Sequence, residues 1–319
     1  MKVVITGAAG FLGDRLADYL LADSSPIAVT ELLLADYLPG KVRSDKRVKT
    51  IVLDITAPDA ADKLIDSNCD IFFHLAAVVS GRAELDFDLG FKVNFDASRA
   101  LLERARHVVP TLKFVFASSL AAYGGHLPPV ITEFVASTPQ SSYGTAKSMV
   151  ELLINDYSRR GFVDGRVVRL PTVSVRAGTA NEALTSFASG IIREPLNGVE
   201  SVCPTRLDVI LWLTSPATVI KNIAHAATLT TGALGQWRCV NMPGFGATVQ
   251  EMLNALEVVG GKKALSLVQF ERDPRVEQLV ESLPTDFDNS RALSFGFTVD
   301  TTFLEVVRSY VRDDLKRKI

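Results

Sequence analysis

Residues 1–13 read Met1-Lys-Val-Val-Ile-Thr-Gly-Ala-Ala-Gly-Phe-Leu-Gly13 and decide the fold. Lys2 to Thr6 form an apolar, β-branched run without alternation, which predicts a parallel strand buried on both faces. Apolar residues then recur at helical spacing from Phe11 to Leu21. This stretch therefore predicts a strand, a glycine-rich turn and a helix, the opening unit of an α/β fold with a parallel sheet.

The three glycines of this turn suit a dinucleotide. Gly7 permits a tight turn, Gly10 lets the backbone approach a pyrophosphate at the helix N-terminus, and Gly13 lets helix and strand pack closely. A turn needed only for packing is the plainer alternative, but a glycine triplet between strand and helix is typical of dinucleotide binding. We expect a Rossmann-type doubly wound parallel sheet with a smaller C-terminal α+β substrate lobe.

Composition narrows the functional class. The chain has 319 residues, 47% of them hydrophobic and 22% charged, which is typical of a globular protein with a large core. A net charge of −2 gives no basic surface, so we expect no nucleic-acid partner. Cys69, Cys203 and Cys239 are scattered and lack C-x-x-C spacing. This pattern predicts no disulfide framework and no metal site, and it favours reduced cysteines in a cytoplasmic protein.

The apolar segments also bear on location. Glycines interrupt the N-terminal apolar run, which argues against a secretory signal. No run reaches the roughly eighteen apolar residues of a membrane span, so we expect no membrane partner.

A second apolar run, Ile27 to Ala35, ends at Asp36. An acidic residue at the end of the second strand can hydrogen-bond the adenosine ribose, and its charge would repel a 2′-phosphate. Asp36 therefore favours NAD over NADP, although a solvated loop aspartate is the alternative. Arg43 lies nearby in the sequence and leaves NADP open.

Two later strands end in segments suited to a nucleotide. Val48 to Leu53 predict a third strand, and Asp54 with Ile55 after it can bracket an adenine. Asp70 to Val79 predict a fourth strand and a turn. The small residues of that turn, Ala76 and Ala77, allow a nucleotide to lie against the backbone.

Two polar residues lie in otherwise apolar stretches. His74 has no Ser, Cys or metal-ligand partner at a matching spacing, which favours a packed or hydrogen-bonded structural histidine over a catalyst. Asn94 interrupts a helix predicted over Phe91 to Arg106, and a buried asparagine must be hydrogen-bonded. It either satisfies backbone near the active site or caps local structure, and the sequence leaves both open.

The chemistry is predicted to lie in a tyrosine-lysine pair. Tyr143-Gly-Thr-Ala-Lys147 opens a helix to about Arg160, and this spacing puts the phenol and the ammonium on one face. A nearby cation favours the phenolate, so we expect Lys147 to lower the pKa of Tyr143 and make it a base. Lys147 could also hold the ribose hydroxyls of a cofactor. Ser119, at the end of the strand from Lys113, would hydrogen-bond the reacting oxygen.

In chain order these motifs resemble those of the extended branch of the short-chain dehydrogenase/reductase superfamily. The matching segments are Thr6 to Gly13, Asp54-Ile55, His74 to Ala77, Ser118-Ser119 with Tyr123-Gly124, and Tyr143 to Lys147. The resemblance implies an NAD(P) cofactor and a catalytic triad of Ser119, Tyr143 and Lys147. Ser119 is preferred over Ser118 because it stands four residues before the Tyr-Gly pair. The implied cofactor contacts are Gly7, Gly10, Phe11, Leu12, Gly13, Asp36, Asp54, Ile55, Leu75, Ala76, Ala77, Tyr143, Lys147 and Pro171.

The predicted substrate depends on the residues after the sixth strand. Sugar-nucleotide members of the family carry Asn-x-Tyr-Gly-Pro there, whereas Val167 to Gly178 read Val-Val-Arg-Leu-Pro-Thr-Val-Ser-Val-Arg-Ala-Gly. The segments Arg169–Arg176 and Trp212–Pro216 are most similar to members that oxidise a four-carbon sugar acid at C2 with NAD. This resemblance implies an NAD-dependent oxidoreductase. The alternatives are a nucleotide-sugar epimerase or dehydratase with tightly bound NAD, and a dinucleotide sensor, which the intact triad disfavours.

A sugar acid needs its carboxylate neutralised. Arg176 and Arg206 are the candidates, since a guanidinium can grip a carboxylate with two hydrogen bonds. An arginine paired to a surface acid is the alternative for either. Ser80, Thr172 and Ser119 could hold substrate oxygens.

The domain organisation is predicted from the order of the elements. Residues 1–171 and about 207–242 are expected to form the NAD-binding domain, and 172–206 with 243–319 the substrate lobe. In the second half we expect a strand near Ser201–Arg206, a helix from Pro216 to Ala227 and a strand Trp237–Asn241 that returns to the main sheet. A capping box at Thr248–Glu251 should open a helix that runs to Val259 and stops at Gly260-Gly261. A loop-rich stretch 264–300 and a final helix Thr302–Lys318 should follow.

The helices at 91–106 and 146–160 are apolar enough to pair across a two-fold axis, as they often do in this family, which predicts a homodimer.

Overall fold

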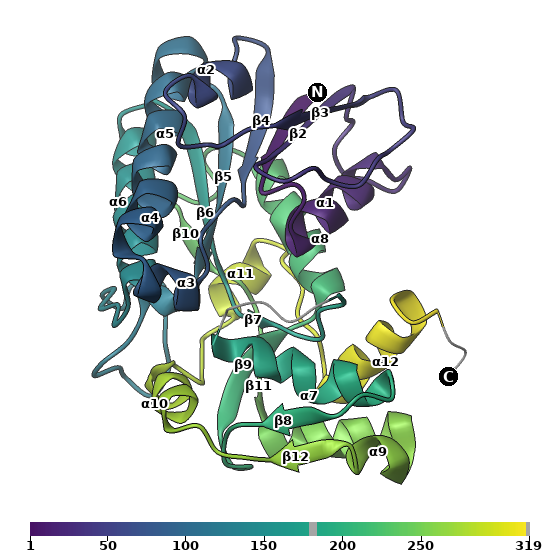
Figure 1. Cartoon of the computed structure of the whole chain (residues 1–319). Coiled ribbons are helices and arrows are strands. Elements are labelled where there is room, and N and C mark those ends of the chain that lie inside the picture. The colour runs from purple at the N-terminus through teal and green to yellow at the C-terminus, as the bar shows by residue number, and fades with distance from the viewer. Residues whose placement is uncertain (179–183, 317–319) are drawn as a thin grey trace. The chain divides into compact units, whose positions relative to one another are not determined.

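The computed structural model describes residues 1–178 and 184–316, and the chain groups into two compact units (Figure 1). The first unit comprises residues 1–122, 137–170 and 220–241, and the second comprises 123–136, 171–219 and 242–319. This division differs from the predicted domain limits mainly at 123–136 and 207–219, which group with the second unit.

The first unit is built on a parallel sheet. Among the described residues its strands are β1 (Lys2–Thr6), β2 (Glu31–Asp36), β3 (Val48–Val52), β4 (Cys69–His74), β5 (Lys113–Ser119), β6 (Asp164–Leu170) and β10 (Cys239–Asn241). Their spatial order is β10-β6-β5-β4-β1-β2-β3, and every pairing is parallel. The order reverses direction between β1 and β4, which confirms the doubly wound fold. Ligands of such sheets bind beyond the carboxyl ends of the strands at this point.

Helices cover both faces of this sheet. They are α1 (Phe11–Leu21), α2 (Ala60–Leu64), α3 (Ser80–Leu85), α4 (Phe87–Phe91), α5 (Ala97–Val108) and α6 (Ser142–Arg159). One apolar cluster joins α2, α5 and α6 to the sheet through side chains such as Leu101, Ile154, Phe72 and Phe114. Figure 1 shows α5 and α6 together on one side of the sheet and α1 on the other.

The helix predicted over Phe91–Arg106 is wrong in detail. The chain instead forms α4, then a π-helical turn η1 (Lys92–Asp96), and then α5. Asn94 lies in this turn. Its side-chain oxygen accepts from the backbone nitrogen of Val78, and its side-chain nitrogen donates to the backbone oxygen of Val78. A π-turn is a local widening of a helix that often accompanies functional sites. Here it accommodates a side chain that holds the loop after β4.

The second unit contains two small sheets and several helices. Strands β11 (Phe245–Thr248), β9 (Ile210–Thr214) and β7 (Thr172–Val173) pair in that order, and β12 (Val268–Phe270) pairs with β8 (Ser201–Cys203). Its core joins β9 to three helices, with Leu211, Ile191, Met252 and Val307 fully buried. Its helical segments are η3 (Leu184–Ser186), α7 (Phe187–Leu196), α9 (Val249–Leu265), α10 (Pro274–Ser282), α11 (Ser290–Ser294) and α12 (Phe303–Asp313).

Several expectations for the second half can now be compared with the structure. The return strand is confirmed as β10 beside β6, the helix after Ser215 is confirmed as α8 (Pro216–Thr228), and the capping box at Thr248 is present. Gly261, with φ of +72°, interrupts the helical geometry of α9 near the predicted stop. The stretch 264–300 contains loops as expected, but the short elements β12, α10 and α11 within it were not predicted. The predicted terminal helix is present as α12, but it ends at Asp313 and is shorter than expected; residues 317 and 318 lie outside the described residues.

The cysteine thiols and the character of the helices were also predicted from the sequence. Cys69, Cys203 and Cys239 are buried thiols that form no disulfide. Within residues 1–178 and 184–316, no helix has the length and apolar character needed to cross a membrane.

Candidate active site

The glycine turn is packed too tightly for any larger side chain. Gly7 has φ of +72°, and a Cβ built on it would lie 2.7 Å from the backbone nitrogen of Ala76. A Cβ on Gly13 would lie 2.1 Å from the carbonyl oxygen of Gly7. Gly10 is the N-cap of α1, so no side chain covers the start of that helix. The turn leaves bare backbone at a helix N-terminus, which is the cradle a pyrophosphate requires.

Asp36 ends β2 beside this turn. Its carboxylate accepts hydrogen bonds from the backbone nitrogens of Ala9, at 2.9 Å, and Leu38, at 3.0 Å. The structure thus places an anion next to the glycine turn, as the sequence predicts. The side chain of Arg43 is only 6% exposed and pairs with Asp14 at 2.6 Å and Asp18 at 2.9 Å on α1. Arg43 is therefore already held by two carboxylates, which weakens the case for a 2′-phosphate partner.

The strand ends after β3 and β4 are also ordered by local contacts. Backbone and side-chain hydrogen bonds from Thr56 lower the pKa of Asp54, which therefore stays ionised. Ile55 beside it is buried. The Leu75–Ala77 segment follows β4, and Asn94 fixes the next residue, Val78, by accepting from its nitrogen at 2.8 Å and donating to its oxygen at 3.0 Å. Of the two roles open for Asn94, the structure favours satisfying backbone beside the site.

His74 is a structural residue. It is fully buried, with Nδ1 2.7 Å from Thr6 Oγ1 and Nε2 2.9 Å from Ser98 Oγ. Burial, with a smaller contribution from the Lys147 charge, lowers the pKa of His74 to about 3. The ring is therefore neutral near pH 7, in agreement with the predicted hydrogen-bonded role.

The structure brings Ser119, Tyr143 and Lys147 together. Ser119 ends β5, and its side chain hydrogen-bonds the Tyr143 phenol at the start of α6. One turn along α6, Lys147 is 1% exposed, and its Nζ donates to the carbonyl of Ala117 at 2.7 Å. The same Nζ lies 5.5 Å from the centre of the Tyr143 ring and 4.5 Å from that of Phe116.

Local sequence fixes the start of α6 in this position. Ser141 caps the helix by accepting from the Gly144 nitrogen at 3.0 Å. The Glu84 carboxylate on α3 accepts from the Ser142 nitrogen at 2.5 Å. Both contacts satisfy first-turn amides, where negative charge is favourable. Gly144 itself lies against η2 (Leu120–Ala122), the segment directly after Ser119.

The electrostatics differ from the prediction. Burial raises the pKa of Tyr143 to about 12, while the hydrogen bond from Ser119 acts to lower it. Burial also lowers the pKa of Lys147 to about 7, and the charge of Glu151 opposes this. The expected lowering of the Tyr143 pKa is therefore wrong for this structure, because loss of solvation outweighs the hydrogen bond from Ser119. The phenol of Tyr143 is therefore protonated near pH 7.

Sequence reasoning missed the ion pair beneath this site. Glu151 on α6 and Arg169 on β6 are both at most 1% exposed and pair at 2.5 Å, and the hydroxyl of Ser118 donates to the same carboxylate. The sequence contained one indication of this pair, the four-residue spacing of Tyr143, Lys147 and Glu151. This spacing places an acidic side chain on the same buried helix face, where it requires a positively charged partner from another element.

The sequence profile of the NAD dependent epimerase/dehydratase family matches residues 3–212. The chain belongs to this family. The match spans the glycine turn, the Ser119–Tyr143–Lys147 set and the first strands of the second unit. It confirms the superfamily resemblance seen in the motifs.

Proteins similar to this member of the epimerase/dehydratase family are described by two different activities. It is 47% identical over 316 residues to the D-erythronate dehydrogenase of Haemophilus influenzae, covering 99% of this chain and 100% of that one. It is 48% identical to the D-erythronate dehydrogenase of Cupriavidus necator, covering 98% of both. A solved structure described as a nucleoside-diphosphate-sugar epimerase from Agrobacterium tumefaciens superposes with a TM-score of 0.94 at 37% identity, covering 100% of this chain and 95% of that one.

The predicted substrate residues of this epimerase/dehydratase chain lie in both units. Ser80 opens α3 in the first unit, and Thr172 of β7 pairs with Leu213 in the second. The guanidinium of Arg206 pairs with Asp208 at 3.0 Å and Glu281 at 2.5 Å. Burial, then the charge of Arg193, lowers the pKa of Arg176. Pro171 follows β6 and groups with the second unit.

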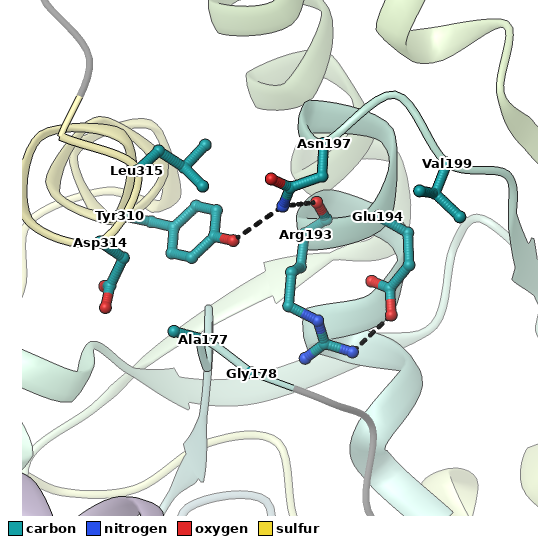
Figure 2. Close-up of a pocket in the computed structure, with 9 residues that line it drawn as sticks. All are labelled: Ala177, Gly178, Arg193, Glu194, Asn197, Val199, Tyr310, Asp314 and Leu315. Atoms are coloured by element: carbon teal, nitrogen blue, oxygen red, sulfur yellow. Dashed lines mark hydrogen bonds and ion pairs between the residues drawn. The ribbon is translucent and has the colours of Figure 1, made fainter.

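A hollow of about 500 Å³ lies in the second unit (Figure 2). It is lined by Ala177, Gly178, Arg193, Glu194, Asn197, Val199, Tyr310, Asp314 and Leu315. Arg193 binds Glu194 at 2.5 Å and the Arg176 carbonyl at 2.8 Å, and Asn197 donates to the Tyr310 oxygen at 3.2 Å. Arg193, Asn197 and Tyr310 are thus hydrogen-bonded to neighbouring groups, whereas Glu194 Oε2 has no partner among the described residues. The guanidinium of Arg193 holds the backbone of Arg176.

Proposed function

We propose that this chain oxidises D-erythronate at C2 to 2-dehydro-D-erythronate, with NAD as the hydride acceptor. The observation that carries the proposal is the hydrogen bond between Ser119 and Tyr143 above the buried ammonium of Lys147. A phenol, a hydroxyl donor and a cation are the groups that remove a proton from an alcohol. The near full-length identity to two D-erythronate dehydrogenases supports the substrate.

The residues proposed to hold the cofactor belong to the first unit, except Pro171. Gly7, Gly10 and Gly13 would hold the pyrophosphate, Asp36 the adenosine ribose, and Asp54 with Ile55 the adenine. The remaining proposed contacts are Phe11, Leu12, Leu75, Ala76, Ala77, Tyr143, Lys147 and Pro171. NAD, when bound, supplies a hydride acceptor and a positively charged nicotinamide ring. A positive charge near Tyr143 would favour its phenolate against the effect of burial.

Each protein group is proposed to have a separate role at the C2 hydroxyl. Tyr143 accepts the hydroxyl proton as the C2 hydrogen leaves with its electron pair. Ser119 donates a hydrogen bond to the same oxygen, and the Lys147 ammonium stabilises the phenolate. Arg176 and Arg206 are proposed to hold the substrate carboxylate, Arg206 after release from Asp208 and Glu281, and Ser80 and Thr172 to hold hydroxyls.

Steady-state NADH formation tests the proposal. The purified chain is assayed with NAD and D-erythronate, and with other sugar acids of four to six carbons. We expect NADH formation that is fastest with D-erythronate and falls about a hundredfold or more in Tyr143→Phe. Absence of turnover on every sugar acid would refute the substrate. Full activity in the Tyr143→Phe enzyme would refute the mechanism.

The second candidate is a nucleotide-sugar epimerase or dehydratase that retains its NAD. The description of the Agrobacterium structure as a nucleoside-diphosphate-sugar epimerase favours it. Cofactor that co-purifies, together with conversion of a UDP-sugar without net NADH, would support it. The absence of the Asn-x-Tyr-Gly-Pro segment after β6 argues for the sugar acid instead.

We also propose a homodimer and a cytoplasmic location. Helix α6 exposes Leu152 and Met149, with 61% and 36% of their surface accessible, and such apolar side chains favour a partner helix. Light scattering of the purified chain tests this, with twice the monomer mass expected. The buried cysteine thiols support a reducing compartment.

A further inference from the structure

Glu151 continues the row of active-site residues on α6. Tyr143, Lys147 and Glu151 are spaced by four residues and therefore share one helix face. Lys147 and Glu151 are each 1% exposed. Two opposite charges one turn apart are thus buried directly beneath the tyrosine.

The Glu151 carboxylate is held in a single position by its partners. Arg169 donates from Nε to both carboxylate oxygens at 3.0 Å and from Nη2 to Oε2 at 2.5 Å. Ser118 donates to Oε1, and the Cys239 thiol lies 3.9 Å from Oε2. Ser118 immediately precedes Ser119, and in the sheet it pairs with Arg169. One carboxylate therefore connects α6, β5 and β6 at the end of the sheet that carries the site.

The charges that face Lys147 come from three elements. His74 on β4 is neutral, Tyr143 and Glu151 lie on its own helix, and Arg169 on β6 stands behind Glu151. Of these, Glu151 carries the negative charge that raises the pKa of Lys147 against burial. Stability alone does not account for such a pair, because buried ion pairs can often be replaced by apolar residues without loss of stability.

We propose that Glu151 is a positioning residue of the dehydrogenase site. Its carboxylate, fixed by Arg169, balances the charge of Lys147 and anchors Ser118, so that the ammonium and Ser119 stay aligned on Tyr143. The proposal rests on the proposed function for its catalytic meaning. The electrostatic effect of Glu151 on Lys147, which we call the charge link, can be measured without catalysis.

The primary experiment is an NMR titration of the Lys147 Nζ in the full chain, assigned by comparison with Lys147→Arg. In Glu151→Gln we expect the titration midpoint to fall by about one pH unit or more, because the neutral amide no longer favours the ammonium. In Glu151→Asp, which keeps the charge, the midpoint should return most of the way to the wild-type value. A midpoint unchanged in Glu151→Gln would overturn the inference.

A matched control separates this role from stability. Asp164 and Arg166 form a buried ion pair at 2.8 Å at the opposite end of β6. Asp164→Asn also leaves an arginine without its buried partner, and it should leave the Lys147 midpoint unchanged. If the Lys147 midpoint shifted equally in Asp164→Asn and Glu151→Gln, the shift would reflect general destabilisation, and the inference would be overturned.

A second variant guards against misfolding. Glu151→Leu combined with Arg169→Met removes both charges, and such replacements are often tolerated. It should fold and shift the Lys147 midpoint in the same direction as Glu151→Gln. A folded double variant with the wild-type midpoint would contradict the charge link.

Kinetics then connect the charge link to the reaction. With D-erythronate and NAD, Glu151→Gln should lose kcat by about tenfold or more with a smaller change in KM. Wild-type enzyme that fails to turn over D-erythronate would refute the proposed function and leave the titration result standing. Wild-type turnover with unaltered kcat in Glu151→Gln would refute the positioning role alone.

Discussion

A Cβ built on Gly144 would lie 2.0 Å from the carbonyl oxygen of Ala121. Gly144→Ala must therefore push the start of α6 away from η2, and Tyr143 away from Ser119. We expect kcat for NADH formation to fall about tenfold or more, because displacement of a catalytic group by a fraction of an ångström is costly. Gly232→Ala is the control, since its Cβ meets nothing within 4 Å. Equal kcat in both variants would show that this close approach does not set the catalytic geometry.

The pH dependence of oxidation should report Tyr143. Because burial raises its pKa, the phenolate fraction grows with pH throughout the alkaline range. We expect kcat/KM for oxidation to increase with pH above neutrality. Ser119→Ala removes the hydrogen bond that lowers the Tyr143 pKa, so its rising limb should lie at higher pH. Ser266→Ala, at an exposed residue, should reproduce the wild-type profile, and a Ser119→Ala profile with only its height reduced would contradict this account.

Cofactor preference should depend on Asp36. Its carboxylate stands beside the glycine turn, where it would repel a 2′-phosphate. Asp36→Asn removes the charge and should raise kcat/KM for NADP relative to NAD by about tenfold or more, which corresponds to roughly 1.4 kcal/mol. Asp45→Asn, in the loop before β3, should leave the ratio unchanged. If Asp36→Asn also left it unchanged, another feature would select the cofactor.

The buried histidine should make stability depend on pH. The pKa of His74 is about 3 in the folded protein against an ordinary value of 6.5, so below pH 6.5 the unfolded chain binds the additional proton. The contribution of neutral His74 is complete above pH 6.5 and is lost as the pH falls toward 3. His74→Gln should flatten this slope by up to one proton, or about 1.4 kcal/mol per pH unit. Urea unfolding between these pH values measures it, and parallel slopes would contradict the role.

The parts of the fold that the sequence predicts correctly depend on neighbouring residues. The strand, glycine turn and α1 are encoded within residues 1–21, and their prediction is confirmed. The turn at Thr248 and the helix after Ser215 are likewise local, because caps use side chains within the first turn.

The parts it predicts poorly depend on distant contacts. The π-turn around Asn94 forms with Val78, and the Glu151 carboxylate finds Arg169 on another strand. The raised pKa of Tyr143 reflects loss of solvation in the folded chain, whereas the sequence showed only one nearby cation. The helices within 264–300 are short, and a weak periodic signal there does not distinguish them from loops.

The edge position of β10 has a consequence for biosynthesis. Cys239–Asn241 pair with β6 at the edge of the sheet, but α7 and β9 of the second unit are synthesised between these two strands. A nascent chain ending before residue 239 would leave the backbone of β6 as an open edge, which is a template for aggregation. We therefore expect the first unit to finish folding late, after the ribosome has released Asn241. A fragment cut at residue 170 should be insoluble even though it contains the complete serine-tyrosine-lysine set.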